Sequence, residues 1–143
     1  MKEKILQLFT EGDAHLKESK SELLASPDDQ CVGTNKCLKA IKKYIETYQL
    51  FLNSTCVLTN NFHLLLHEIT EKDPEFEMFA AKIFQVKCFS EESKKYKEEF
   101  FLYDNEVNDV INIALEIRDY ISKKIHFDQK FLYQYQGTSF MAI

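Results

Sequence analysis

The sequence holds very little glycine and proline. It has 3 Gly and 2 Pro in 143 residues, fewer than the tight turns of β-sandwiches and β-barrels normally require. It has no tryptophan, and no apolar run approaches the ~20 residues that cross a membrane. A chain of this length can bury about two-thirds of the surface it exposes when unfolded, without disulfides or a metal. These features favour one helical domain.

Arginine is almost absent. Seventeen of the 18 basic residues are lysine, and Arg118 is the only arginine. With 23 acidic residues the net charge is −5, which excludes a general attraction to nucleic acid and leaves only local basic patches. Because bidentate recognition of phosphate usually uses arginine, a nuclease of this sequence would depend on that single residue.

Cysteine pairs at metal-binding or redox spacings are also missing. The 4 cysteines form no C-x-x-C pair, and residues 1–9 are too short and too interrupted for the apolar core of a signal peptide. We therefore expect a cytoplasmic protein whose cysteines are free thiols. Cys37 and Cys88 are predicted on apolar helix faces, and a Cys31–Cys37 redox pair is the alternative.

What the sequence does have is helical periodicity. Two N-terminal helix signals stand out: Thr34 and Asn35 are acceptable N-caps, and Asp73 precedes Pro74 as a cap precedes the first helical residue. Residues 90–103 are charged and read as a connection or a poorly committed helix. Apolar residues at three- and four-residue steps predict helices over residues 2–25, 34–53, 62–70, 74–89 and 104–125. This order predicts an all-α, antiparallel four-to-five-helix up-and-down bundle.

Two helical segments carry a resemblance to a known family. They are residues 35–51, NKCLKAIKKYIETYQLF, and residues 61–69, NFHLLLHEI. In this order they resemble the HEPN family, small bacterial helical domains often encoded beside nucleotidyltransferases. The resemblance covers residues 1–126. It implies a bundle that pairs as a homodimer, with a nucleotidyltransferase-type protein as partner and a nucleotide or RNA as candidate ligand.

Many HEPN proteins are also metal-independent ribonucleases with an R-x4–6-H motif. Here Arg118 and His126 are separated by seven residues, which on a helix leaves their side chains about 80° apart and ~12 Å apart along the axis. The resemblance therefore implies a non-catalytic binding module without a cofactor. Two alternatives remain open: a divergent ribonuclease toxin that uses Arg118 and His126, and a helical interaction domain without a ligand.

The candidate ligand-binding residues are His63, Lys36, Lys39 and Lys43. His63 matches the histidine of the family's second segment and is expected to hydrogen-bond to neighbouring helices. His63 and His67 stand at i and i+4, which can present two imidazoles to a metal, but no further ligands can be named and no metal site is predicted. The lysines can attract phosphate, and a solvated lysine face is the alternative.

The C-terminal residues 127–143 form an aromatic tail. Disordered tails are usually polar, so this one is predicted to dock, either on its own bundle or across a homodimer, the commonest oligomer. A monomer with the tail folded back is the alternative. Its large apolar residues are Phe127, Phe131, Leu132, Tyr133, Tyr135, Phe140 and Met141.

Overall fold

The part of the chain that the structure describes is built from helices. The computed structural model describes residues 2–25, 27–54 and 61–125, and none of these residues lies in a strand. This confirms the all-α prediction. The five α-helices in this part are α1 (Lys2–Ala25), α2 (Gln30–Asn53), α3 (Phe62–Lys72), α4 (Ala80–Tyr96) and α5 (Asp104–Ile125). Short 3₁₀ helices connect them: η1 (Pro27–Asp29), η2 (Pro74–Phe79) and η3 (Lys97–Glu99).

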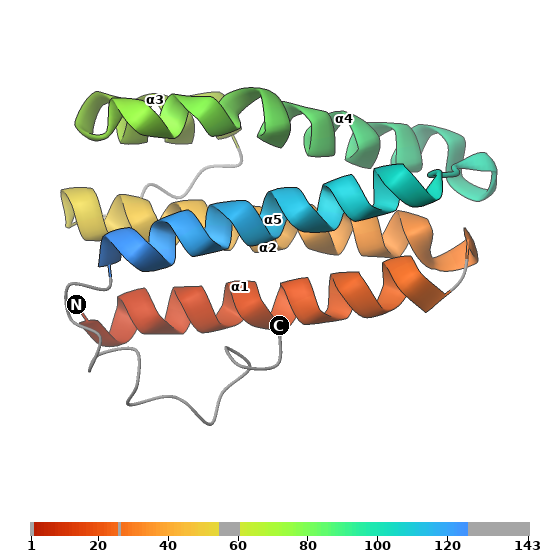
Figure 1. Cartoon of the computed structure of the whole chain (residues 1–143), viewed down its shortest axis with the longest axis horizontal. Coiled ribbons are helices and arrows are strands. Elements are labelled where there is room, and N and C mark those ends of the chain that lie inside the picture. The colour runs from red at the N-terminus through yellow and green to blue at the C-terminus, as the bar shows by residue number, and fades with distance from the viewer. Residues whose placement is uncertain (1, 26, 55–60, 126–143) are drawn as a thin grey trace.

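Helix α2 lies at the centre of the bundle and contacts each of the other four α-helices. It runs antiparallel to α1, and α3 and α4 lie together along one side of the bundle (Figure 1). The turns from α1 to α2 and from α4 to α5 share one end of the molecule, while α5 ends at the other, beside the start of α1 (Figure 1). No helix within the described ranges has both the length and the hydropathy of a membrane span.

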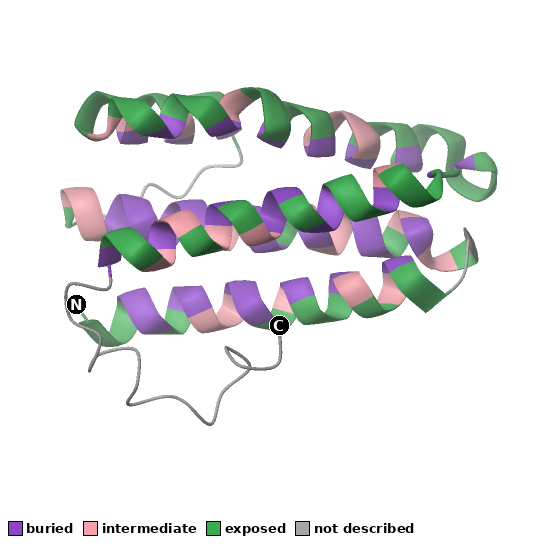
Figure 2. Ribbon diagram, in the orientation of Figure 1, coloured by how far each residue is buried: buried purple, intermediate pink, exposed green. Residues whose placement is uncertain are grey.

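The core follows the apolar stripes predicted from the sequence (Figure 2). In α2, Ile41, Tyr44 and Tyr48 are buried at this core, and Phe51 is half-buried. Cys37 is buried with them, and burial raises the pKa of its thiol to about 12, which makes it a poor nucleophile. Cys31, Cys37 and Cys88 are free thiols, while Cys56 lies outside the described residues. The buried face of α5 comprises Val107, Val110, Ile111, Ile113, Ala114, Ile117, Ile121 and Ile125.

The predicted start of the second helix is wrong by four residues. Helix α2 begins at Gln30, directly after η1, so Thr34 and Asn35 lie inside the helix and do not cap it. Their side chains are satisfied there: Thr34 Oγ1 donates to the Gln30 carbonyl at 2.7 Å, and Asn35 Nδ2 donates to the Cys31 carbonyl at 2.8 Å. Such bonds to the preceding turn let cap-forming residues sit within a helix.

Helix α4 continues past its predicted end at residue 89 to Tyr96, so residues 90–96 are helical and are not the connection that was one of the two interpretations of this segment. Its last two turns bury serines in place of apolar residues. Ser90 Oγ donates to Asn35 Oδ1 at 2.5 Å, and Asn35 Nδ2 donates to Ser93 Oγ at 3.1 Å. A helix face that packs through a polar network gives no apolar periodicity. The helix ends at Tyr96, and the next residue, Lys97, adopts a positive φ of 51°.

Candidate functional site

The only arginine is held inside the bundle by a buried carboxylate. Arg118 of α5 donates from Nε to Asp13 Oδ1 at 2.7 Å and from Nη2 to Asp13 Oδ2 at 3.3 Å. Tyr44 of α2 donates its hydroxyl to the same Asp13 at 2.6 Å. Asp13 is fully buried, and the guanidinium stands 5.1 Å from the centre of the Phe9 ring. These contacts join α1, α2 and α5 through one charged cluster.

This cluster gives Arg118 a structural role that the sequence did not reveal. Burial lowers the pKa of Arg118, but the hydrogen bonds and charge of Asp13 raise it more, so the net shift is upward. The guanidinium is charged, bidentate and paired, and its side chain is only 14% exposed. His126, the second residue of the ribonuclease alternative, lies outside the described residues.

The predicted lysine patch is partly neutralised by α1. Lys36 Nζ lies 2.9 Å from Glu18, and Lys43 Nζ lies 3.1 Å from Glu11. Lys39 is exposed between these two pairs along α2. Exposed ion pairs add little stability, but each carboxylate cancels charge that would otherwise attract a phosphate. The predicted patch is therefore a row of ion pairs between α1 and α2.

His63 lies elsewhere, at the start of α3. Asn61 caps this helix by accepting hydrogen bonds from the backbone amides of His63 and Leu64, at 3.0 and 3.3 Å. The His63 side chain is exposed and borders a groove of about 200 Å³ between α3 and α4. The other residues of this groove are mostly apolar: Phe62, Leu66, Ala80, Ala81, Ile83, Phe84 and Lys87.

The four predicted ligand-binding residues thus do not form one site, because Lys36 and Lys43 pair with α1 while His63 borders α4. His67 pairs with Glu71 at 3.0 Å. In residues 2–25, 27–54 and 61–125 no three His, Cys, Asp or Glu side chains come together as metal ligands.

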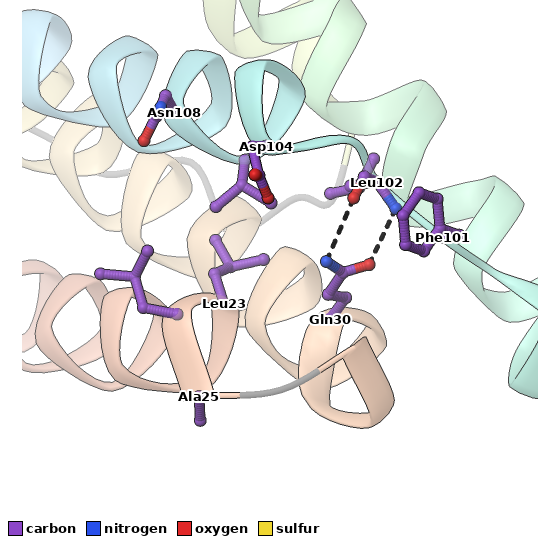
Figure 3. A pocket seen from close by; sticks show the side chains of 9 residues that line it. Leu23, Ala25, Gln30, Phe101, Leu102, Asp104 and Asn108 are labelled. Atoms are coloured by element: carbon purple, nitrogen blue, oxygen red, sulfur yellow. Dashed lines mark hydrogen bonds between the residues drawn. The ribbon is translucent and has the colours of Figure 1, made fainter.

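A larger pocket lies at the end of the bundle where α1 turns into α2 and where α5 begins. It has a volume of about 410 Å³. Figure 3 shows the buried Gln30 beside it: its Nε2 donates to the Leu102 carbonyl at 3.2 Å, and the Leu102 amide donates to its Oε1 at 2.8 Å. This amide holds the segment between η3 and α5 against the start of α2. The lining residues are Leu23, Leu24, Ala25, Gln30, Phe101, Leu102, Asp104, Val107 and Asn108.

The same end of the molecule carries a second cavity and several exposed apolar side chains. The second cavity, of about 370 Å³, is lined by Asp28, Cys31, Lys97, Glu98 and Phe100. Among the described residues eight large apolar side chains are exposed. Two of them, Leu24 and Phe101, line the larger cavity, and two more, Tyr96 and Tyr103, are next in sequence to lining residues of the two cavities. We call these four residues and the lining of both cavities the bundle-end surface. The sequence did not reveal this surface, because residues 90–103 indicate a charged connection or a poorly committed helix.

At the opposite end, two tyrosines share one carboxylate. Tyr48 and Tyr120 donate their hydroxyls to Asp73 Oδ2, at 2.5 and 2.6 Å. Asp73 was expected to cap the helix that follows it, but it makes no side-chain cap hydrogen bond there. Burial raises the pKa of Asp73, whereas the two tyrosine hydroxyls lower it more, so the net shift is downward. The carboxylate therefore ties α2 and α5 to the turn before η2.

Alkaline pH is expected to unfold the protein as its inner tyrosines ionise. Burial, and then the neighbouring Asp13 or Asp73, raises the pKa of Tyr44, Tyr48 and Tyr120 in the folded state. Their stabilising contribution is complete below the unfolded pKa of about 10 and is lost as pH rises above it. Tyrosinate absorbance from these residues should appear together with loss of helical circular dichroism. Ionisation of all 7 tyrosines with unchanged helicity would contradict this.

Comparisons of the chain with models of protein families, with curated proteins and with solved structures give no match.

Proposed function

We propose that the protein is a non-catalytic, HEPN-like binding module that acts through a protein partner. The bundle-end surface carries this proposal. It gathers exposed apolar side chains around two cavities, whereas single scattered apolar residues are the norm on proteins without a docking site. The helical architecture agrees with what the HEPN resemblance implies for residues 1–126, and a nucleotidyltransferase-type protein is the partner class that the resemblance suggests.

The charge arrangement favours a protein over a nucleotide as ligand. Lys36 and Lys43 already pair with Glu18 and Glu11, and Arg118 pairs with the buried Asp13. A phosphate would have to compete with these carboxylates for each cation. The same pairing disfavours the ribonuclease alternative. Arg118 would have to leave its bidentate contact with Asp13 before its guanidinium could stabilise charge on a phosphorane.

Purified protein is expected to leave structured and unstructured RNA intact in the absence of metal. The reason is that Arg118 donates both hydrogen bonds to the buried Asp13, and that the seven residues between Arg118 and His126 exceed the spacing of the R-x4–6-H motif. The assay compares the native chain with Arg118→Lys and His126→Ala, each checked for native helicity by circular dichroism. RNA cleavage by the native chain that both substitutions abolish would overturn the proposal in favour of the ribonuclease.

The partner is tested by co-expressing the full chain with the proteins encoded beside it and measuring mass by light scattering. We expect a complex of fixed stoichiometry with one of them, built on a homodimer of this chain. The aromatic tail, residues 127–143, lies outside the described residues, and its proposed docking is tested on a chain that ends at Lys130. If no complex forms and the purified chain binds ATP or GTP, the proposed protein partner is wrong and the ligand is a nucleotide.

A further inference from the structure

We infer that the bundle-end surface receives a positively charged protein segment that places an apolar side chain in the larger cavity. This inference rests on the proposed function and specifies the chemistry of its partner. Three features of the described residues support it: the shape of the cavity, the charge around it and the poor fit of other occupants.

The larger cavity has both apolar and polar lining residues, and one of its walls is held in place. Leu23, Leu102 and Val107 line it as buried residues, while Leu24 and Phe101 are exposed at its rim. The two hydrogen bonds between Gln30 and the Leu102 backbone fix one wall (Figure 3). A wall that is already ordered lowers the entropic cost of binding, and burying one large apolar side chain contributes favourably.

The charge around the two cavities is negative. Asp104 lines the larger cavity, and Asp28 and Glu98 line the smaller one, where Lys97 is the one cation among the described residues of the lining. A second cation, Lys95, lies beside this surface with its Nζ 5.3 Å from the centre of the Tyr96 ring. In the described ranges no ion pair neutralises these three carboxylates, unlike Glu11 and Glu18 on the same bundle. Asp104 lies in the first turn of α5, where its negative charge interacts favourably with the positive end of the helix dipole. Lysine or arginine residues flanking an apolar anchor would complement this rim.

Other occupants fit this surface less well. Nucleic acid and anionic lipid carry the same sign of charge as the rim. A second copy in a two-fold contact would bring the same carboxylates face to face, because such an interface pairs one patch with itself. The chain's own residues 127–143 contain one acidic and one basic residue, Asp128 and Lys130, and so supply no net positive charge.

The test uses the full chain and three fluorescent synthetic peptides of equal length. One carries leucine at helical spacing among lysines, one has glutamate in place of each lysine, and one has serine in place of each leucine. We expect the leucine–lysine peptide to bind at least about tenfold more tightly than the other two, with affinity that falls as salt rises. Equal binding of the leucine–glutamate peptide would overturn the inference.

Two variants locate the site, since Phe101 and Phe84 are both 55% exposed. Phe101→Ser lies on the bundle-end surface and should weaken the leucine–lysine peptide about tenfold or more. Phe84→Ser lies on the α3–α4 groove and should leave binding unchanged. Glu98→Gln should reduce the salt dependence. Equal losses in both phenylalanine variants, or a loss in Phe84→Ser alone, would refute the bundle-end site.

The natural partner separates failure of this inference from failure of the proposed function. A co-purified partner retained by Phe101→Ser and released by Phe84→Ser would refute the bundle-end site and leave the binding module intact. A native chain that forms no complex with any protein encoded beside it, and binds none of the three peptides, would refute both.

Discussion

The Arg118→Met variant is expected to lose about 3–5 kcal/mol of unfolding free energy relative to the native chain. Arg118 is the partner of a fully buried carboxylate, Asp13, which accepts two of its hydrogen bonds. Methionine fills much of the same space but leaves that charge without a cation inside the bundle. The tyrosine hydroxyl of Tyr44 alone would remain on it. Urea denaturation followed by circular dichroism measures the loss.

Two controls separate the buried pair from charge removal in general. Lys82→Met removes the cation of an exposed ion pair, Lys82–Glu116 at 2.6 Å, and should cost no more than about 1 kcal/mol. Adding Asp13→Asn to Arg118→Met should restore part of the lost stability, because the uncompensated charge is then gone. Equal losses in Lys82→Met and Arg118→Met would show that the buried contact is not what stabilises the fold.

The helices could be predicted where their buried faces are apolar. The bounds of α1 and α5 match the periodicity of residues 2–25 and 104–125. The predicted helix ends differ from the structure where polar side chains face a neighbouring helix, as Asn35, Ser90 and Ser93 do between α2 and α4. No periodicity of a single segment reveals a hydrogen bond to a residue 55 positions away along the chain.

The partners of the charged residues in the candidate site could not be predicted from the sequence either. The sequence shows that Arg118 is unique and that lysines line one face of residues 35–51, but it does not show their partners on α1. One signal was available: Asp13 follows Gly12 on the apolar stripe that includes Leu16, where a carboxylate needs a cation. The bundle-end surface gave no such signal, because it joins residues 23–31 to residues 96–108 and forms only when the two turns meet.

The glycines of α1 and α2 lead to the second large effect. Replacing glycine by alanine within a helix normally adds about 0.5–1 kcal/mol of stability. Gly12→Ala and Gly33→Ala are expected to do the opposite, each losing about 1–3 kcal/mol. A Cβ at Gly12 would lie 2.7 Å from Cε1 of Tyr44, and one at Gly33 would lie 3.0 Å from the backbone nitrogen of Leu23.

Neither neighbour can move aside cheaply. The Tyr44 ring is buried and its hydroxyl is held by Asp13, and Leu23 N belongs to the backbone of α1. Ser19 Oγ also donates to the Gly33 carbonyl at 2.6 Å, a contact that a separation of α1 from α2 would break. The cost therefore comes from forcing apart the two longest helices of the bundle.

The matched control lies two residues from Gly12. Ala14 is exposed on the same helix, so Ala14→Gly should cost about 0.5–1 kcal/mol through helix propensity alone. If helix propensity alone decided, Ala14→Gly would lower the unfolding free energy and Gly12→Ala would raise it. Close packing of α1 on α2 predicts instead that both substitutions lower it. Urea midpoints of the three single variants decide between them. A higher midpoint for Gly12→Ala would mean that α1 and α2 do not approach as closely as Tyr44 requires, and the cluster of Asp13, Tyr44 and Arg118 would then lose its geometric basis.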